Sequence, residues 1–373
     1  MSANADPPVR TVFLIIPVDY AAGGLQRSTL ALRECLESAG YSVTIYCFKL
    51  LPGGLARQHP FVRRITHERR SKLLFWLATV RAIRRHIREG RPEALIAFGT
   101  VPSILLPLAS AFMKVPLTVG SERAYPPAER LQSWLERLRR ISFPRLDLIV
   151  CQTSGIRDWF LGHLRVRDRQ VVIIPNIVAP ATRRRNAEPD GVSGPPTIIC
   201  VGRLDEQKGF VFALEIFARI LESRPDALLT IAGEGPLGEQ LRRRADALGI
   251  AGRVNFSGRI ANLEDHWAAA DLFLFTSLFE GFPNALAEAM ANGVAPVAFD
   301  CPTGPSELIT DGVNGYLVPL GDVEAATARC IELLADSAKR RGFGERAREV
   351  AQRYSAERIG QLWLELIARK TQP

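Results

Sequence analysis

The feature that most limits the fold of this chain is an alternation of short apolar runs with helical patterns, which occurs twice along the sequence. Runs that are apolar on both faces are typical of parallel strands covered by helices on either side. The strand–helix order therefore predicts an α/β fold with two doubly wound parallel sheets. In the first series, strands are expected at Thr11–Ile16, Ser42–Phe48, Ala94–Phe98, Pro116–Val119, Leu146–Cys151 and Val171–Ile174. In the second series, they are expected at Thr197–Val201, Ala227–Ala232, Arg253–Ser257, Asp271–Thr276, Ala295–Phe299 and Gly315–Val318.

The composition changes between the two series. Residues 179–196 read APATRRRNAEPDGVSGPP, without periodicity and rich in Pro, Gly and Arg, which is typical of a linker. Because 373 residues are too many for one ordinary core, we expect one Rossmann-like domain at 1–178 and a second at 197–352. A last helical pattern within 353–373 is expected to pack back on the first domain. The carboxyl ends of the two sheets are expected to face each other across a cleft.

Cysteine use and hydropathy exclude several classes of protein. The six cysteines form no Cys-x-x-Cys pair and have no histidine at metal-ligand spacing, so we expect buried free thiols in a reducing compartment. The first ten residues lack the apolar segment of a signal peptide. The most apolar stretch, Val101–Gly120, contains three prolines and Lys114, so it predicts a buried helix and a strand and not a membrane span.

Charge is distributed unevenly between the two halves. Residues 1–178 carry 26 Lys and Arg against 13 Asp and Glu, whereas residues 179–373 carry 22 against 26. A basic first half and a mildly acidic second half indicate a polyanionic partner for the first half only. The sequence contains no recognised nucleic-acid-binding motif, so nucleic acid is not the expected partner.

The segment Phe279–Met290, FEGFPNALAEAM, carries the strongest functional signal. Pro283 suits the first position of a helix, whose free N–H groups and dipole would bind a diphosphate. Glu288 is surrounded by apolar helix residues, so its carboxylate requires a polar partner such as a pair of ribose hydroxyls. The alternative is a solvated surface glutamate. The candidate donor-binding residues of this segment are Gly281, Phe282, Pro283, Asn284, Ala285, Leu286 and Glu288.

Two glycine-containing loops of the second series are further candidates. In Val201–Gly209, VGRLDEQKG, Arg203 and Lys208 are spaced to clamp one diphosphate, although an ordinary surface loop is equally compatible with the pattern. The loop Ala232–Gly238, AGEGPLG, satisfies the spacing G-x-G-x-x-G, with Gly233 and Glu234 at its start.

The glycine spacing alone does not favour NAD. A dinucleotide fold would place an acidic residue near the end of the next strand, where this chain has Asn255 and Ser257. We therefore expect the loop at Gly233 to line a nucleotide cleft.

The first half has weaker signals at two strand ends. Gly23 and Gly24 lie in the first strand-to-helix turn, where glycines let a backbone approach a ligand, although an ordinary tight turn is the alternative. Glu122 and Arg123 follow the strand Pro116–Val119 and are positioned like site residues.

Two basic amphipathic patterns lie in the first half. Lys72–Arg88 carries Trp76 among its apolar residues and Arg81, Arg85 and Arg88 on its flank. A second pattern, Leu131–Ile141, also combines a tryptophan with arginines. Such helices lie on anionic membrane surfaces, and the alternative is a core-packed helix with a solvated basic face.

Taken together, these segments resemble glycosyltransferase family 4, whose members are retaining enzymes of the GT-B fold. The resemblance spans nearly the whole chain and rests on GGLQ (Gly23–Gln26), VIIPN (Val172–Asn176), VGRLDEQKG, IAGEGP (Ile231–Pro236), DGVNGYLVP (Asp311–Pro319) and the Glu-x7-Glu pair Glu280 and Glu288. SER (Ser121–Arg123), CQT (Cys151–Thr153) and DCPTGPSE (Asp300–Glu307) resemble a branch that uses UDP-hexoses or UDP-N-acetylhexosamines. Members of that branch often build bacterial surface glycans on polyprenyl-diphosphate carriers.

The resemblance implies roles for individual residues. Arg203 and Lys208 would hold the donor diphosphate, Glu288 would bind the ribose and Glu280 would lie beside the donor sugar. Some members place a histidine against the donor sugar, and we expect Glu122 and Arg123 to stand in its place. The first domain would bind a lipid-linked glycan acceptor and the second the UDP-sugar.

Metal is not expected to take part. The chain has no Asp-x-Asp sequence of the kind that holds a diphosphate-bridging cation, and the GT-B fold does not require one. The resemblance favours a same-face retaining displacement assisted by the leaving diphosphate. We expect no cofactor, and a cytoplasmic protein that lies peripherally on the inner face of the cell membrane. The alternatives are an epimerase, a transferase with a soluble acceptor, or a non-catalytic sugar-nucleotide-binding subunit.

Overall fold

The computed structural model divides the chain into two compact units, which are described separately. The first unit comprises Met1–Ile177 with Ala356–Pro373, and the second comprises Val178–Ser355. The structure describes residues 10–18, 24–50, 54–65, 72–129, 131–180, 194–260 and 263–371. Most of the expected linker and Gly23 lie outside these ranges.

The first unit contains a parallel sheet of seven strands in the order β3-β2-β1-β4-β5-β6-β7. The strands are β1 (Arg10–Val18), β2 (Tyr41–Lys49), β3 (Val62–Arg64), β4 (Ala94–Phe98), β5 (Leu117–Ser121), β6 (Leu148–Cys151) and β7 (Val171–Ile173). Six of them confirm the apolar runs of the sequence. The seventh, β3, has only one buried residue, Val62, and therefore has no apolar run by which to recognise it.

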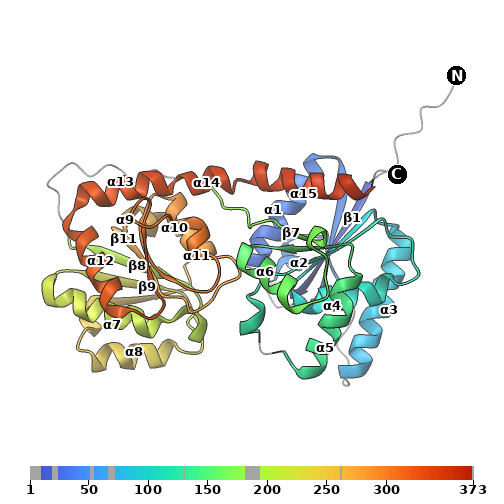
Figure 1. Cartoon of the computed structure of the whole chain (residues 1–373). Helices are drawn as coiled ribbons and strands as arrows, with labels where there is room; N and C mark the ends of the chain where they lie inside the picture. Colours follow the sequence, from blue (N-terminus) through green and yellow to red (C-terminus); the bar gives the residue numbers. More distant parts are fainter. Residues whose placement is uncertain are drawn as a thin grey trace. The chain divides into compact units, whose positions relative to one another are not determined.

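Helices cover both faces of this sheet (Figure 1). They are α1 (Gly24–Ser38), α2 (Leu55–Gln58), α3 (Lys72–Gly90), α4 (Thr100–Ser110), α5 (Ser133–Ser142), α6 (Ser154–His163) and α15 (Ala356–Thr371). Helix α4 packs between α3 and α5 on one face, and α15 packs on α1 on the other. The stretch Val101–Gly120 forms most of α4 and β5, as expected. Among the described residues, no helix is both long and apolar enough to cross a membrane.

Helix α15 joins the first unit although it comes last in the sequence. Trp363 is almost completely buried, and its ring lies 6.2 Å from that of Phe98. Gly360 faces Cys35 of α1, whose Sγ lies 3.4 Å from the carbonyl oxygen of Ala356. The apolar face of α15 therefore completes the core under the sheet.

The second unit contains a parallel sheet of six strands in the order β10-β9-β8-β11-β12-β13. The strands are β8 (Thr197–Val201), β9 (Leu228–Ala232), β10 (Val254–Gly258), β11 (Leu272–Phe275), β12 (Ala295–Asp300) and β13 (Tyr316–Pro319), each within two residues of its expected bounds. The helices are α7 (Phe210–Ser223), α8 (Gly238–Ala247), α9 (Glu264–Ala269), α10 (Asn284–Ala291), α11 (Pro305–Leu308), α12 (Val323–Ala335), α13 (Ser337–Ala347) and α14 (Glu349–Arg353).

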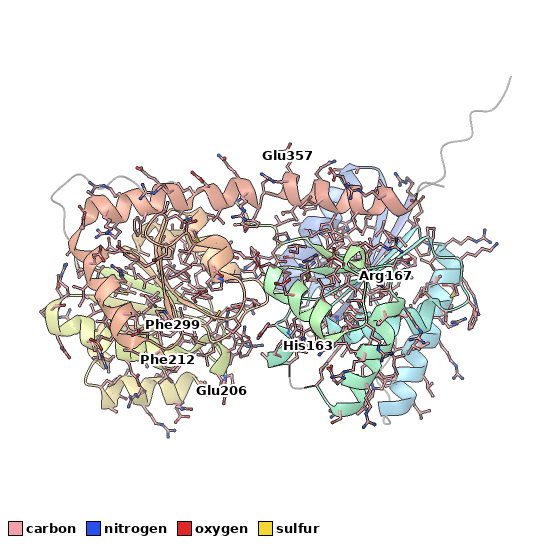
Figure 2. The ribbon with its side chains drawn as sticks, in the orientation of Figure 1. His163, Arg167, Glu206, Phe212, Phe299 and Glu357 are labelled. Carbon is pink, nitrogen blue, oxygen red and sulfur yellow. The ribbon has the colours of Figure 1, made fainter. Side chains whose placement is uncertain are left out.

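The core of the second unit is formed by apolar strand residues and the helices that cover them. Phe212 of α7 and Phe299 of β12 pack edge to face with ring centroids 5.7 Å apart (Figure 2). Short 3₁₀ turns lie at Pro126–Ala128, Phe143–Arg145, Asp168–Gln170, Glu206–Lys208 and Ala251–Arg253.

Both sheets reverse their strand order at one place. In the first unit, β1 pairs with both β2 and β4, and in the second, β8 pairs with both β9 and β11. In open α/β sheets, ligands bind outside the carboxyl ends of the strands at such a switch point. The loops after β8 and β11, and those after β4 and β5, are therefore the first places to look for functional side chains.

Candidate functional site

Two loops at the switch point of the second sheet bring Lys208 and Glu280 together. Lys208 ends the 3₁₀ turn after β8, and Glu280 lies in the segment after β11. Lys208 Nζ lies 2.6 Å from Glu280 Oε1. Gln207 Nε2 donates to Glu280 Oε2 at 3.3 Å and to the carbonyl of Phe279 at 3.0 Å. Glu280 is thus held by two residues of the neighbouring loop.

A glycine makes this approach of the two loops possible. Gly209 has φ +59°, and a Cβ at this position would lie 2.2 Å from the carbonyl oxygen of Thr276. Thr276 also donates through Oγ1 to the carbonyl of Lys208 at 3.0 Å. Since only glycine fits here, the sequence fixes how close Lys208 comes to the end of β11.

The Lys208–Glu280 pair is largely removed from solvent. The side chains are 18% and 6% exposed, so each charge depends on the other for compensation. Thr303 donates its hydroxyl to the backbone carbonyl of Glu280. Burial raises the pKa of the nearby Cys301 thiol to about 12, with Glu280 adding to the rise, so this cysteine is an inert thiol.

Arg203 differs from Lys208 in its surroundings. Its side chain is 69% exposed and forms an ion pair with Asp205 of the same loop. The structure therefore places one of the two expected diphosphate cations in a buried pair and leaves the other at the surface. Their joint role in holding a diphosphate stays a prediction.

Helix α10 begins one residue later than expected. Pro283 precedes its first residue with ψ 74°, so it occupies the N-cap and not the first helical position. The first helical bond runs from the amide of Ala287 to the carbonyl of Pro283 at 3.0 Å, and the amide of Asn284 bonds to Phe282 at 2.9 Å. The amides of Ala285 and Leu286 precede the first helical bond, as an anion site at a helix start requires.

Glu288 lies one turn into α10 and is half-buried. Ala287, Ala289 and Met290 around it are buried, so its carboxylate lies among apolar neighbours on this helix. Phe282 is buried against the ring of Tyr354, with centroids 5.5 Å apart. Gly281 is also buried.

The glycine loop after β9 packs against the backbone of its neighbour. A Cβ on Gly233 would lie 1.8 Å from the carbonyl oxygen of Gly202, which explains this glycine without a ligand. Glu234 is exposed. In the first unit, Gly24 is the first residue of α1.

Glu122 and Arg123 lie at the carboxyl end of β5, as expected. The side chain of Glu122 is fully buried, and the catalytic role expected for it stays a prediction. Its Oε1 accepts from the amides of Arg123 and Ala124 at 2.9 and 3.4 Å. Burial raises the pKa of Glu122 to about 8, and the carboxylate of Glu129 adds to the rise.

A hydroxyl connects Glu122 to a second carboxyl. Thr100 Oγ1 lies 2.7 Å from Glu122 Oε2 and 2.6 Å from Glu129 Oε2. Glu129 in turn lies 3.6 Å from the buried guanidinium of Arg139, which also pairs with Glu136 at 2.6 Å. Sequence reasoning missed Thr100 and Glu129, since neither belongs to a recognised motif.

Arg123 is held by groups from three strand ends. Its guanidinium lies 4.6 Å from the ring centre of Phe98, at the end of β4. Nη1 donates to Asn176 Oδ1 at 2.5 Å, and Nη1 lies 3.2 Å from the amide oxygen of Gln152 when that amide is oriented to satisfy its neighbours. Asn176 and Gln152 lie within VIIPN and CQT, so the motifs marked them but assigned them no role.

The basic helix α3 is only partly as expected. Arg81, Arg85 and Arg88 are exposed. Trp76 is half-buried and packs against the core beside Phe75, and its expected contact with lipid stays a prediction. The apolar pattern could not distinguish the core side of this helix from its outer edge.

Within the ranges that the structure describes, no group of three or more His, Cys, Asp or Glu residues is arranged to hold a metal ion. None of the six cysteines, all of which lie in these ranges, forms a disulfide bond, and five of them are buried.

Two family models together match most of the chain. Residues 22–182 match the model described as Glycosyltransferase Family 4, and residues 183–350 match the model described as Glycosyl transferases group 1.

Curated relatives are similar over most of this chain. An exopolysaccharide phosphotransferase of Streptomyces coelicolor is 31% identical over 80% of this chain, which spans only 32% of that longer protein. The lipopolysaccharide core biosynthesis glycosyltransferase LpsE of Rhizobium meliloti is 29% identical over 77% of this chain and 79% of its own length. A Campylobacter jejuni enzyme is 27% identical over 77% of each chain. Its name is GalNAc-α-(1→4)-GalNAc-α-(1→3)-diNAcBac-PP-undecaprenol α-1,4-N-acetyl-D-galactosaminyltransferase.

Solved structures share the fold. The structure of HepE from Anabaena in complex with UDP and glucose has a TM-score of 0.82 to this chain. The two are 20% identical, and the match covers 96% of this chain and 100% of HepE.

Proposed function

This chain belongs to glycosyltransferase family 4, and from that premise we propose that it moves a hexose or N-acetylhexosamine from a UDP-sugar to a glycan acceptor. The observation that carries the proposal is the Lys208–Glu280 pair at the switch point of the second sheet. A cation, a buried carboxylate and the start of α10 are what a sugar diphosphate needs: charge compensation, a hydroxyl-binding group and amide donors.

In the proposed donor complex, different residues bind different parts of the UDP-sugar. The diphosphate takes the amides at the start of α10 together with Lys208 and Arg203, while Glu288 accepts from the ribose hydroxyls. Glu280, already hydrogen-bonded by Gln207, orients the donor sugar. As the sugar–phosphate bond breaks, negative charge grows on the leaving UDP, and the cations stabilise it. The acceptor oxygen attacks from the same face, so the anomeric configuration is retained, and no metal is required.

The acceptor is proposed to be linked to a polyprenyl diphosphate in bacterial glycan assembly. Two observations support this: the relative from Campylobacter jejuni is named for such an acceptor, and the first half of the chain is strongly basic. The UDP and glucose of the HepE complex favour a UDP-sugar donor on the same fold.

A surface of the first unit supports contact with an anionic membrane. Exposed apolar side chains lie on three adjacent helices or just beyond them, and they are Leu74, Leu77, Leu108, Phe112, Trp134 and Ile141. Arg81, Arg85 and Arg88 lie on the first of these helices. Apolar side chains beside arginines are the composition of a peripheral membrane surface. The protein is accordingly proposed to lie on the inner face of the cell membrane.

The test is a donor screen followed by product analysis. The full chain is titrated calorimetrically with UDP, GDP and ADP, and UDP is expected to bind tightest. UDP-hexoses and UDP-N-acetylhexosamines are then incubated with bacterial lipid-linked glycans, with and without EDTA. A transferred sugar whose anomeric proton retains the donor configuration, formed equally with EDTA, is the expected result. Tightest binding of GDP or ADP would contradict a UDP-sugar donor. Inversion at the anomeric carbon would contradict the retaining mechanism, and a loss of turnover in EDTA that Mg²⁺ restores would contradict the metal-free reaction.

A further inference from the structure

The arginine that follows β5 has an unusual environment for a half-buried cation. No carboxylate forms an ion pair with Arg123 among the described residues, and its Nε is buried without a hydrogen bond. Its side-chain partners are the neutral amides of Asn176 and Gln152 and the ring of Phe98. A buried cation without a counter-ion is costly, so such groups are retained where they meet an anion.

The nearest carboxyl does not supply that counter-ion. Thr100 Oγ1 contacts carboxyl oxygens of both Glu122 and Glu129, but a hydroxyl has one hydrogen and can donate to only one of them. The other carboxyl must donate to Thr100, and it therefore carries a proton. The geometry of the chain requires one neutral carboxyl in this pair.

The proton belongs to Glu122. Burial raises the pKa of both carboxyls, but Glu129 lies 3.6 Å from the Arg139 guanidinium and is a quarter exposed, so it ionises more readily than Glu122, despite Glu136 on the other side of Arg139. Glu122 is fully buried and faces only Thr100, two backbone amides and the more distant charges of Arg123, Arg139 and Glu129. Glu122 therefore donates from Oε2 to Thr100, which donates to Glu129, while Glu122 Oε1 still accepts from the amides of Arg123 and Ala124.

This arrangement leaves the charge of Arg123 available. The Arg123 residue is only half-buried, and its Nη2 forms no hydrogen bond within the described part of the chain. Asn176 and Gln152 are almost completely buried and fix the guanidinium in place. The result, for the residues that the structure describes, is a fixed cation without a carboxylate partner at the carboxyl edge of the first sheet.

We propose that Arg123, fixed by Asn176 and Gln152 and kept uncompensated by the proton that Glu122 shares through Thr100, binds an oxyanion. The identification of that oxyanion as a phosphate or carboxylate group of the acceptor rests on the proposed transferase function; the binding site itself does not. A guanidinium fork fits either group, since both present two oxygens to it.

The test uses sulfate, whose charge does not change in the working pH range, on the full chain with saturating UDP to occupy the second unit. Calorimetry is expected to show sulfate binding that Arg123→Gln weakens at least ten-fold. Asn176→Asp provides a second variant that keeps the fold: it places a carboxylate against Arg123 and is expected to abolish sulfate binding as well. Arg140→Gln, which removes an exposed arginine of α5, is the matched control and is expected to bind like the wild type.

The role of the proton is tested between pH 6.5 and 8.5. Wild-type sulfate affinity is expected to fall roughly five-fold as Glu122 ionises beside Arg123. Glu122→Gln keeps a neutral group that can donate to Thr100 and is expected to bind sulfate with a flat profile over the same range. Methyl glucuronide then replaces sulfate to distinguish a phosphate ligand from a carboxylate ligand. A site that prefers carboxylates binds methyl glucuronide more tightly than sulfate.

The outcomes are distinct. Equal sulfate affinity in wild type, Arg123→Gln and Asn176→Asp would overturn the site. Identical pH profiles of wild type and Glu122→Gln would overturn the shared proton. Failure of UDP to bind the wild type would contradict the proposed donor while the sulfate titrations, repeated without UDP, still decide this inference.

Discussion

Lys208 Nζ lies 2.6 Å from Glu280 Oε1, and both side chains are largely buried at the switch point of the second sheet. This ion pair has a role both in the unliganded protein and in the proposed donor complex. In the unliganded protein each charge compensates the other, and in the proposed donor complex the lysine also faces a diphosphate. The pair therefore links the stability of these loops to the charge that enters the site.

Removing only one partner of this pair is expected to destabilise the protein. Lys208→Met leaves the Glu280 carboxylate buried without a cation, and we expect a loss of about 2–4 kcal/mol in the free energy of unfolding. The double variant Lys208→Met/Glu280→Gln leaves no uncompensated charge and is expected to lose less than the single variant. Urea unfolding of the wild type, both single variants and the double variant completes the cycle. Additive losses would show that the two charges do not interact.

Donor binding is expected to depend on Glu288. Glu288→Gln removes the charge that is proposed to accept from the ribose hydroxyls, at a cost of about 1.5–3 kcal/mol, which is roughly ten-fold or more in UDP affinity. Calorimetric titration with UDP measures this directly. Glu239→Gln, on the exposed surface of α8, changes the same charge and is the matched control. Unchanged UDP affinity in a folded Glu288→Gln protein would remove the ribose assignment.

The strands and the donor-side residues were accessible from sequence for a physical reason. Parallel strands buried on both faces, such as Ala94–Phe98, have apolar runs without interruption, and Lys208 and Glu280 lie in motifs close to strand ends. The three-residue strand β3 has no such run. For Trp76 the sequence left two interpretations open, because an apolar position on a basic helix fits the core as well as a lipid surface, and the structure shows the packing on the core.

The contact of Glu122 and Glu129 through Thr100 could not be predicted from the sequence. Glu122 reads as an exposed site residue because it follows a strand, and only the fold shows that Thr100, 22 residues earlier, covers it. Glu129 approaches the same hydroxyl from the segment after a 3₁₀ turn. Such contacts depend on the packing of α4 and α5, for which the local pattern contains no signal.

Stability is expected to depend on pH through Glu122. Its pKa is raised from 4.5 to about 8 in the folded protein, so between these values the folded state holds one proton more than the unfolded state. The stabilisation is therefore fully present below about pH 4.5 and is lost as the pH rises to about 8. Glu122→Gln lacks this dependence.

Urea unfolding at several pH values between 5 and 8 tests whether the free energy of unfolding falls as the pH rises. Relative to Glu122→Gln, the wild type is expected to lose up to about 1.4 kcal/mol per pH unit over this range. Groups other than the coupled pair contribute equally to both proteins and cancel in the difference. Parallel stability profiles would mean that Glu122 is ionised in the folded protein.

The contact of α15 with α1 is expected to tolerate no added methyl group at Gly360. A Cβ there would lie 2.7 Å from Cys35 Sγ and 3.0 Å from its Cβ, so Gly360→Ala should lower the melting temperature despite the better helix propensity of alanine. Gly162→Ala in α6 is the control, since a Cβ there meets nothing within 4 Å and should stabilise by up to about 1 kcal/mol. Cys35→Ala in the Gly360→Ala background is expected to restore part of the loss. A rise in melting temperature for Gly360→Ala alone would contradict the close packing of α15 on α1.

Membrane binding is expected to require the arginines of α3. Each basic side chain near an anionic leaflet contributes about 1 kcal/mol, so changing Arg81, Arg85 and Arg88 to glutamate should release the protein from anionic liposomes. Co-sedimentation with vesicles that contain phosphatidylglycerol, at low and high salt, measures the effect. The matched control changes the exposed Arg242, Arg243 and Arg244 of α8 to glutamate, which alters the net charge equally and should leave sedimentation unchanged.

The apolar part of the same surface needs its own variant, because basic residues alone would bind vesicles only at low salt. Leu74 and Leu77 are 58% and 46% exposed on α3, so changing both to serine removes apolar area without opening the core. The serine variant should keep binding at low salt and lose the salt-resistant fraction. UDP affinity, carried by the second unit, should stay at the wild-type value in all of these proteins.

Equal sedimentation of the wild type and the α3 arginine variant would show that this face is only a solvated basic surface. Loss of binding in the α8 control as well would show that net charge, and not the α3 surface, determines attachment.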